Sequence, residues 1–306
     1  MSKMNKLTKS EYWRQRQNRR LAYSERISNQ AIANIAEVYD DSLKHVQKRI
    51  DDILNNYSKD IGVNKDTLKQ LLNDHDRDKL LSGLEDRLHN LGDSNENLAW
   101  LRGNYLHRLN EQESIQLELE TERRLISELE EKFSNQGYSK TMEEAYETLT
   151  SDLTGVPKKL SKTAKDMILN NKWIADGNYS NRIWNNTDKL FKDVNRIIKS
   201  GLLSGRSRVD MQRELSERYG VALYRAETLV RTEMNYFENS AELLSYIDSG
   251  VTEYEYFATR DKRTSETCVL LDKKIFKVTD AVVGENYPPL HPNCRSGTLP
   301  VIDSMD

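Results

Sequence analysis

The sequence has no long apolar run, and this shortage excludes several classes of protein. Nowhere do apolar residues continue for the roughly 20 positions that a membrane-spanning helix needs. The basic residues near the N-terminus are not followed by an apolar segment, so we expect no secretory signal peptide. The sequence therefore predicts a protein that is made in a reducing cytosol and has no membrane partner.

Cysteine, proline and glycine are also scarce. The 306 residues include 2 cysteines, 5 prolines and 13 glycines. In a reducing compartment, two cysteines favour free thiols or metal ligands over a disulfide. The shortage of helix-breaking residues, together with 31% charged and 37% apolar residues, indicates long, solvent-exposed helices around a modest core.

Motifs that mark common enzymes are missing as well. The chain has neither His-x-Glu nor Pro-Cys-x-x-Cys of the zinc deaminases, and no nucleophile elbow, P-loop or glycine-rich dinucleotide turn. We therefore expect a protein without enzymatic activity.

Apolar residues recur at spacings of three and four through the N-terminal part, and this period predicts long helices. One apolar stripe runs from Ile32 to Tyr57, with Gly62 expected to end that helix and Asn64 to cap the next one. A further long helix is expected over residues 94–133, closed by Gly137. The charged run 74–78 is interpreted as a solvated turn, because it lacks the spaced acceptors of a calcium loop.

Gly155-Val156-Pro157 is the first firm break in the helical pattern. We place a domain boundary there, with an extended helical region at 1–155 and a second domain at 156–306. In the second domain the helices shorten and bulky residues become frequent, so a larger core is expected. Five positions are expected to mark helix ends and caps in this part: Gly201 and Gly205 around a turn, Ser207 as a cap, Gly220 as a stop before a helix over 222–249, and Gly250 as its end.

The N-terminus carries most of the local positive charge. Eight basic residues and two acidic ones lie between Lys3 and Arg26. Aromatic residues are mixed with arginines there, as in many segments that bind nucleic acid through phosphates. Two uses remain open, a salt-dependent contact with DNA and a contact with an acidic protein surface; the candidate residues are Trp13, Arg14, Arg16, Arg19 and Arg20.

Residues 251–301 differ in composition from everything before them. They contain both cysteines and four of the five prolines, and they open with an alternating aromatic piece at 254–259 that predicts a strand. We expect a small module in which helices are closed by a short β-rich knot.

Cys268, His291 and Cys294 are residue types that zinc prefers as ligands. Their spacing matches no standard zinc finger, and a fourth ligand would have to be water, Asp261 or another carboxylate. Three alternatives stay open: a structural zinc ion, a metal-dependent hydrolase, and a knot without metal. In the last, His291, Arg263 and Arg295 would bind backbone carbonyls and the carboxylates of Glu233 and Asp261.

Several separated motifs occur in a characteristic order: Ala226-Glu227 with Leu229 to Glu233, Gly250-Val251 with Tyr254, Asp261 with Arg263-Thr264 and Cys268, and Pro288 to Arg295. Over roughly residues 160–301 this order resembles the Mu F-like phage head morphogenesis proteins, minor capsid proteins of tailed phages. The chain departs from the family pattern at Ser265, Lys273 and Ser296, where relatives often have cysteine, glycine and cysteine. A site with four cysteine ligands is therefore excluded.

The helical periodicity and the composition of residues 251–301 together predict a fold that is mainly α, with long N-terminal helices and a small C-terminal α+β module. The resemblance implies a virion component present in a few copies, recruited by the portal protein in the host cytoplasm during procapsid assembly and acting in DNA packaging or ejection. Capsid or scaffolding protein and non-specific phage DNA are further candidate partners. The matching motif residues expected to maintain the module are Arg231, Glu233, Asp261, Arg263, Thr264 and Arg295.

Overall fold

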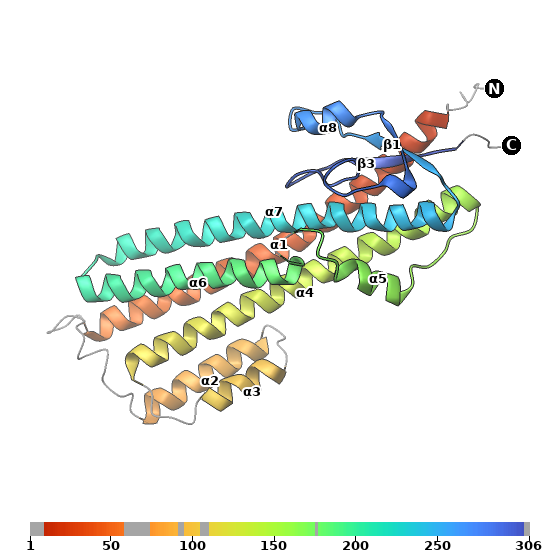
Figure 1. Cartoon of the computed structure of the whole chain (residues 1–306). Helices are drawn as coiled ribbons and strands as arrows, with labels where there is room; N and C mark the ends of the chain where they lie inside the picture. Colours follow the sequence, from red (N-terminus) through yellow and green to blue (C-terminus); the bar gives the residue numbers. More distant parts are fainter. Residues whose placement is uncertain (1–8, 58–73, 91–94, 105–109, 175–176, 303–306) are drawn as a thin grey trace, which may run out of the picture. The chain divides into compact units, whose positions relative to one another are not determined.

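The computed structural model describes residues 9–57, 74–90, 95–104, 110–174 and 177–302 (Figure 1). Within these ranges the chain forms eight α-helices and, near its C-terminus, a three-stranded antiparallel sheet. The predicted fold class, mainly α with a small C-terminal β-containing module, is confirmed. None of the described helices is both long and apolar enough to cross a membrane.

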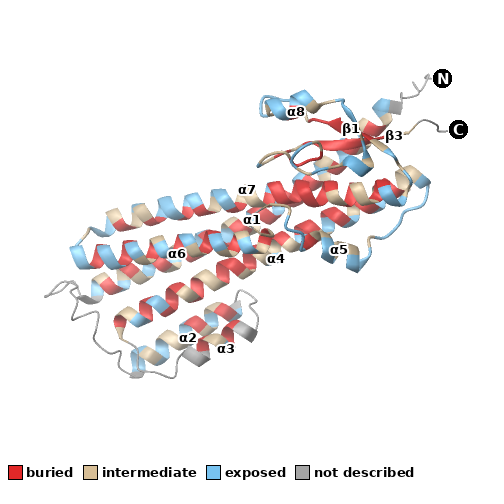
Figure 2. Cartoon of the chain, viewed as in Figure 1, coloured by how far each residue is buried: buried red, intermediate tan, exposed pale blue. Residues whose placement is uncertain are grey.

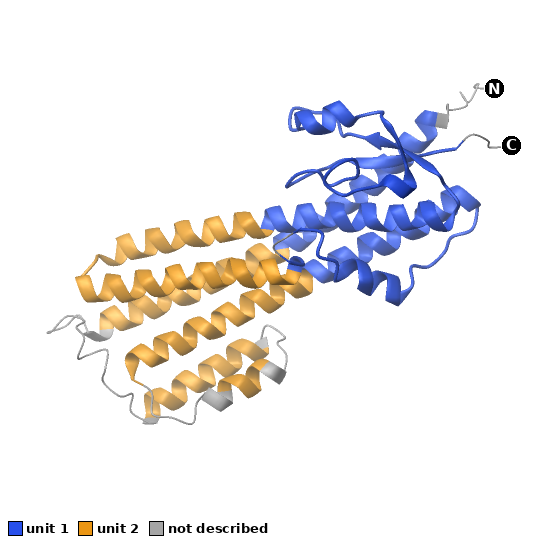
Figure 3. Cartoon of the chain, viewed as in Figure 1, with its two compact units in different colours: residues 1–33, 134–179, 227–306 blue, residues 34–133, 180–226 orange. Residues whose placement is uncertain are grey.

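The chain divides into two compact units, and each is assembled from separate segments (Figure 3). Unit 1 contains residues 1–33, 134–179 and 227–306, and unit 2 contains residues 34–133 and 180–226. Several long helices contribute residues to both units. The boundary predicted between residues 155 and 156 falls inside unit 1.

Four helices form the N-terminal half: α1 (Lys9–Tyr57), α2 (Asp74–Asn90), α3 (Asn95–Asn104) and α4 (Glu111–Thr154). The prediction of one helix over 94–133 is wrong, because this range contains α3 and the first part of a separate α4. The predicted stop at Gly137 is wrong too. A Cβ at Gly137 would lie 3.1 Å from Met234 Cε and 3.4 Å from Ile27 Cγ2, so this glycine allows close packing inside a continuous helix.

The charged run at 74–78 is the beginning of α2, not a turn. Acidic side chains are favourable in the first turn of a helix, where they face the positive end of the helix dipole. Gly62 and Asn64 lie outside the described residues.

Three further helices follow: α5 (Lys162–Leu169), α6 (Tyr179–Ser204) and α7 (Arg208–Asp248). The expected cap is confirmed, because Ser207 Oγ accepts a hydrogen bond of 3.1 Å from the backbone N–H of Asp210. Gly205 and Gly250 follow α6 and α7 with φ of +65° and +74°, as expected of glycines that end helices. The other two expected turn positions are wrong, because Gly201 lies inside α6 and Gly220 lies inside α7.

The sheet of unit 1 is small. Its strands are β1 (Glu253–Phe257), β2 (Ile275–Lys277) and β3 (Gly297–Val301), in the order β2-β1-β3. Tyr254 of β1 pairs with Phe276 on one side and Pro300 on the other. Helix α8 (Glu266–Leu271) and a short 3-10 helix, η2 (Val278–Asp280), lie between the strands in the sequence.

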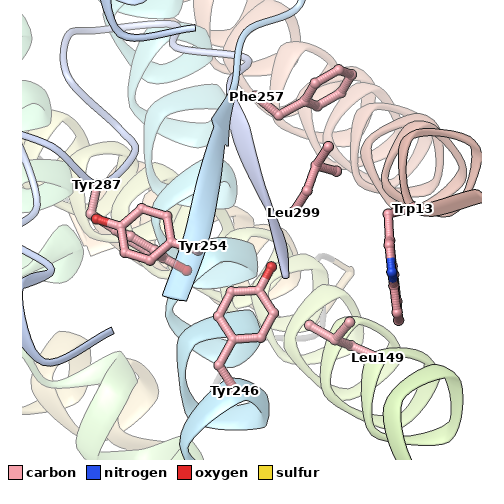
Figure 4. Close-up of a cluster of buried hydrophobic side chains, with 7 residues drawn as sticks. All are labelled: Trp13, Leu149, Tyr246, Tyr254, Phe257, Tyr287 and Leu299. Carbon is pink, nitrogen blue, oxygen red and sulfur yellow. The ribbon is translucent and has the colours of Figure 1, made fainter. Parts of the chain in front are cut away.

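The core of unit 1 joins this sheet to α1, α4 and α7. Figure 2 shows that burial is concentrated where these elements meet, and Figure 4 shows the apolar cluster that they share. The cluster consists of Trp13, Leu149, Tyr246, Tyr254, Phe257, Tyr287 and Leu299. The start of α1 is therefore part of the same core as the C-terminal sheet.

Unit 2 is a helical unit that contains several buried acidic side chains. Arg87 of α2 pairs with Glu122 of α4, and Arg49 of α1 lies 2.9 Å from Glu118. Glu130 accepts a hydrogen bond of 2.8 Å from the Tyr39 hydroxyl. These contacts join α1, α2 and α4 through polar groups as well as through apolar packing.

Candidate metal centre

Local structure in unit 1 brings Cys268, His291 and Cys294 together. Cys268 lies in α8, whose N-cap Ser265 accepts a hydrogen bond of 3.3 Å from the Cys268 backbone N–H. His291 and Cys294 lie in the loop before β3, in a turn closed by a bond of 3.2 Å from the Cys294 N–H to the His291 carbonyl. Asn293, with φ of +59°, takes the left-handed conformation that this turn requires.

The potential ligand atoms of these three residues all lie within 4.8 Å of one another. Cys268 Sγ is 3.2 Å from His291 Nε2 and 3.9 Å from Cys294 Sγ. Both cysteines are free thiols and only 2% exposed, whereas His291 is partly exposed. The cluster therefore has a buried sulfur side and a histidine nearer to solvent.

A hydrogen bond of the Nδ1 atom sets the orientation of the His291 ring. Nδ1 lies 2.9 Å from the Pro292 carbonyl, and since a carbonyl only accepts, Nδ1 carries the proton in this bond. Nε2 is thereby directed toward the sulfur of Cys268.

The two thiols differ in acidity because they share a hydrogen bond. This bond lowers the pKa of Cys294 to about 6 and raises the pKa of Cys268 to about 12, where burial contributes in the same direction. The Tyr256 hydroxyl also donates to Cys268 Sγ, at 3.3 Å.

Comparison with known proteins places these residues in a family. Residues 192–299 match the family model described as Phage Mu protein F like protein. This segment is similar to the Mu F-like proteins, and we call it the Mu F-like domain. The match runs from within α6 to β3 and includes Cys268, His291 and Cys294, and it confirms the resemblance read from the sequence motifs. Comparisons with curated proteins and with solved structures gave no match.

Four motif residues of the Mu F-like domain form one polar cluster beside the cysteines. Arg295 makes a bidentate ion pair with Asp261, with N···O distances of 2.7 and 2.6 Å. Asp261 also accepts from the Arg263 backbone N–H, and its own N–H donates to Thr264 Oγ1 at 2.9 Å. The hydrogen bonds from Arg295 and the Arg263 backbone hold the pKa of Asp261 well below its ordinary value.

The two motif residues on α7 lie elsewhere in the domain. Glu233 is buried and accepts a bond of 3.2 Å from the Trp173 indole N–H, a contact that we had not anticipated. Arg231 is exposed and pairs with Glu227 one turn earlier, at 3.3 Å. The expected bonding of an arginine to a carboxylate is therefore found at Asp261, where Arg295 is the donor.

Sequence reasoning missed the residues of α7 that hold the ligand-bearing loop. Thr232 Oγ1 accepts from the Asn293 N–H at 2.9 Å, and the Asn235 side chain donates to the Ser296 carbonyl at 2.8 Å. The Asn239 side chain donates to the same Ser296 carbonyl, and the backbone carbonyl of Asn239 accepts a hydrogen bond of 2.8 Å from the Tyr287 hydroxyl. The available signal was the group of polar residues that interrupts the apolar face of α7 over 232–245.

The five candidate residues of the basic N-terminal segment belong to α1. Trp13 is buried in the unit 1 core, and Arg14 pairs with Glu255 of β1 at 2.7 Å. Arg16 lies 3.2 Å from Asp152, and Arg20 lies 2.8 Å from Glu242. Arg19 is exposed. Most of the positive charge in this group is therefore matched by carboxylates of the same unit.

Proposed function

We propose that the chain is a minor capsid protein of a tailed phage that acts in head morphogenesis without enzymatic activity. It associates with the portal protein during procapsid assembly and serves DNA packaging or ejection. The observation that carries this proposal is the match of residues 192–299 to the Mu F-like family.

The contacts of the motif residues support a structural role for this domain. The pair of Asp261 and Arg295 and the bond between Thr232 and Asn293 each join segments that are far apart in the sequence. Such contacts maintain a fold. A hydrolase would instead need a carboxylate free to move protons, but Asp272, like Asp261, is engaged: it accepts from the Ala258 N–H at 3.0 Å and from Arg260 at 2.9 Å.

The DNA-binding alternative receives less support than the protein-contact alternative. Counterion release requires basic side chains that can reach phosphates. Arg14, Arg16 and Arg20 instead face Glu255, Asp152 and Glu242.

Co-expression with the portal protein encoded by the same phage tests the proposal. We expect the two proteins to purify together through a tag on either one, whereas the portal protein of an unrelated phage should not retain the chain. Mass spectrometry of purified procapsids and virions should find the chain at a few copies per particle. Failure to bind the portal protein, together with absence from both particles, would overturn the proposal.

A deletion of the gene separates the two proposed roles. If the chain serves packaging, the mutant phage should accumulate capsids that lack DNA. If it serves ejection, the mutant should produce full capsids that adsorb to cells but fail to deliver their genome. The measurement is the ratio of full to empty capsids by electron microscopy, beside the infectious titre.

A further inference from the structure

We propose that Cys268, His291 and Cys294 bind one zinc ion in a tetrahedral site whose fourth ligand is water. The ion joins α8 to the loop that precedes β3 and acts as a structural staple of the Mu F-like domain. This inference concerns the stability of the domain and does not depend on the portal as partner.

The spacing of the two sulfurs fits a shared metal. Zinc–sulfur bonds of about 2.3 Å at a tetrahedral angle place two thiolates about 3.8 Å apart. The Cys268 and Cys294 sulfurs are 3.9 Å apart. A disulfide would need the sulfurs at about 2.0 Å. The observed separation is therefore too long for a bond between the two sulfurs and close to that expected for two ligands of one zinc ion.

The histidine completes the set with the correct atom. A nitrogen and a sulfur on one tetrahedral zinc are separated by roughly 3.6 Å, and His291 Nε2 is 3.2 Å from Cys268 Sγ. The bond from Nδ1 to the Pro292 carbonyl is the kind of outer contact that orients metal-binding histidines and fixes their tautomer. The Tyr256 hydroxyl provides a similar outer contact for Cys268 Sγ.

The donor set selects zinc by its chemistry. Two thiolates and an imidazole are soft or borderline ligands, which disfavour magnesium and calcium and suit tetrahedral zinc. Among the described residues, the metal-capable group contains these three side chains only. Asp261 and Asp272 are engaged by Arg295 and Arg260. The partly exposed side of His291 therefore leaves the fourth position to solvent.

The position of the site explains what an ion would do for the fold. The cysteines are 26 residues apart in the sequence, and the chain between α8 and β3 contains only one short strand and one 3-10 turn. A segment with so little regular structure loses much entropy on folding, and a metal held at both of its ends offsets part of that loss. The apolar cluster around the sulfurs is small, consisting of Tyr256 and Ala258 with three partly buried neighbours, Leu271, Phe276 and Leu290.

Elemental analysis of the full chain, purified without chelators from zinc-supplemented cells, is the direct test. We expect about one zinc per chain. In His291→Gln and in Cys294→Ser the zinc content should fall to near zero. His75→Gln is the matched control, because His75 is an exposed histidine of α2 in unit 2; it should retain the zinc content of the parent.

Cobalt substitution keeps the test decisive if Cys294→Ser fails to fold. Tetrahedral cobalt(II) bound by thiolates gives intense visible bands and a sulfur-to-metal charge-transfer band in the near ultraviolet. We expect both in the parent and in His75→Gln, and their loss in His291→Gln, which removes only a partly exposed side chain. Parent protein without metal, zinc retained by His291→Gln and Cys294→Ser, or a mass that shows a Cys268–Cys294 disulfide would each overturn the proposal.

Discussion

Arg20 of α1 and Glu242 of α7 form an ion pair that is almost completely withdrawn from water. Their Nε and Oε1 atoms are 2.8 Å apart, and the side chains are 4% and 0% exposed. The Gln17 amide also donates to Glu242, at 3.2 Å, and Arg20 also reaches Asp152. Arg20, which the sequence suggested as a contact for DNA or for an acidic protein surface, thus lies in the interior of unit 1.

Arg20→Met should destabilise unit 1 by about 3–5 kcal/mol, because Glu242 would be left as a buried charge without its partner. Denaturant-induced unfolding followed by circular dichroism gives the measurement. Arg19→Met is the control, since Arg19 is the exposed neighbour and should change the stability by less than about 0.5 kcal/mol.

The double variant Arg20→Met, Glu242→Leu should recover most of the loss, since replacing both members of a buried pair by apolar residues is often neutral. Equal stability losses in Arg19→Met and Arg20→Met would contradict the assignment of Arg20 to the interior.

Trp13→Ala should lower the free energy of unfolding by about 3–5 kcal/mol, as expected for an aromatic side chain removed from a core. Trp13 is 4% exposed and lies in the apolar cluster of unit 1 with Leu149 and Leu299. Tyr12→Ala, which changes a partly exposed aromatic residue at the edge of the same cluster, should cost less. Thermal unfolding of the two variants makes the comparison, and a larger loss for Tyr12→Ala would contradict the observed packing.

The burial of Trp13 and Arg20 affects how a truncation of the basic N-terminal segment should be interpreted. Deletion of residues 1–26 removes Trp13 and Arg20 together with the exposed charges. If such a truncation lost DNA or portal binding, the cause could therefore be unfolding of unit 1 as well as the loss of a direct contact. Arg19→Glu is the cleaner variant, because it reverses an exposed charge without removing a core residue.

The sequence predicts most of the helices because apolar periodicity reflects one buried face of each helix. It does not predict which glycines end a helix. Gly155 and Gly250 do so with positive φ, whereas Gly137 permits close packing inside α4 and Gly220 remains exposed inside α7. The difference depends on tertiary neighbours, which a local pattern does not contain.

The candidate site was predictable in the same limited sense. Only two cysteines are available, so Cys268 and Cys294 were natural candidates, and the structure brings them together with His291. The supporting contacts were not predictable, because Asn235 and its partner Ser296 are 61 residues apart. Nothing in the local sequence of a helix says which distant carbonyl a buried asparagine will bind.

Glu130→Gln should change how the stability of the protein depends on pH. Glu130 is buried in unit 2, and burial raises its pKa from 4.5 to about 8, against the smaller opposite effect of its bond to Tyr39. The folded state therefore holds a proton that the unfolded state releases. The free energy of unfolding should be highest below pH 4.5 and should decrease as the pH rises to about 8, by up to a few kcal/mol from this residue.

Glutamine does not ionise, so the difference in stability between Glu130→Gln and the parent isolates this contribution. Relative to the parent, the free energy of unfolding of the variant should increase progressively from pH 5 to pH 8, as measured by urea unfolding at each pH. Glu147→Gln, at an exposed position of α4, should reproduce the parent profile. Parallel profiles for Glu130→Gln and the parent would show that Glu130 is ionised in the folded protein.

Gly201→Ala and Gly220→Ala should have opposite effects, although both glycines lie inside helices. Alanine is favoured over glycine in a helix by about 1 kcal/mol. At Gly220 no heavy atom of the described chain lies within 4 Å of an added Cβ, so the variant should be stabilised by about that amount. At Gly201 an added Cβ would overlap Met211 Sδ and lie 2.9 Å from Met211 Cγ.

Overpacking of this kind costs about 1–3 kcal/mol, so Gly201→Ala should be less stable than Gly220→Ala by roughly 2 kcal/mol. Met211 is fully buried between α6 and α7, and a smaller residue there would remove the overlap. The double variant Gly201→Ala, Met211→Ala should consequently lose less stability than the two single variants added together, because the two side chains compete for the same space. Strict additivity in denaturant unfolding would mean that α6 and α7 separate to accommodate the methyl group, so that Gly201 is not required for their close approach.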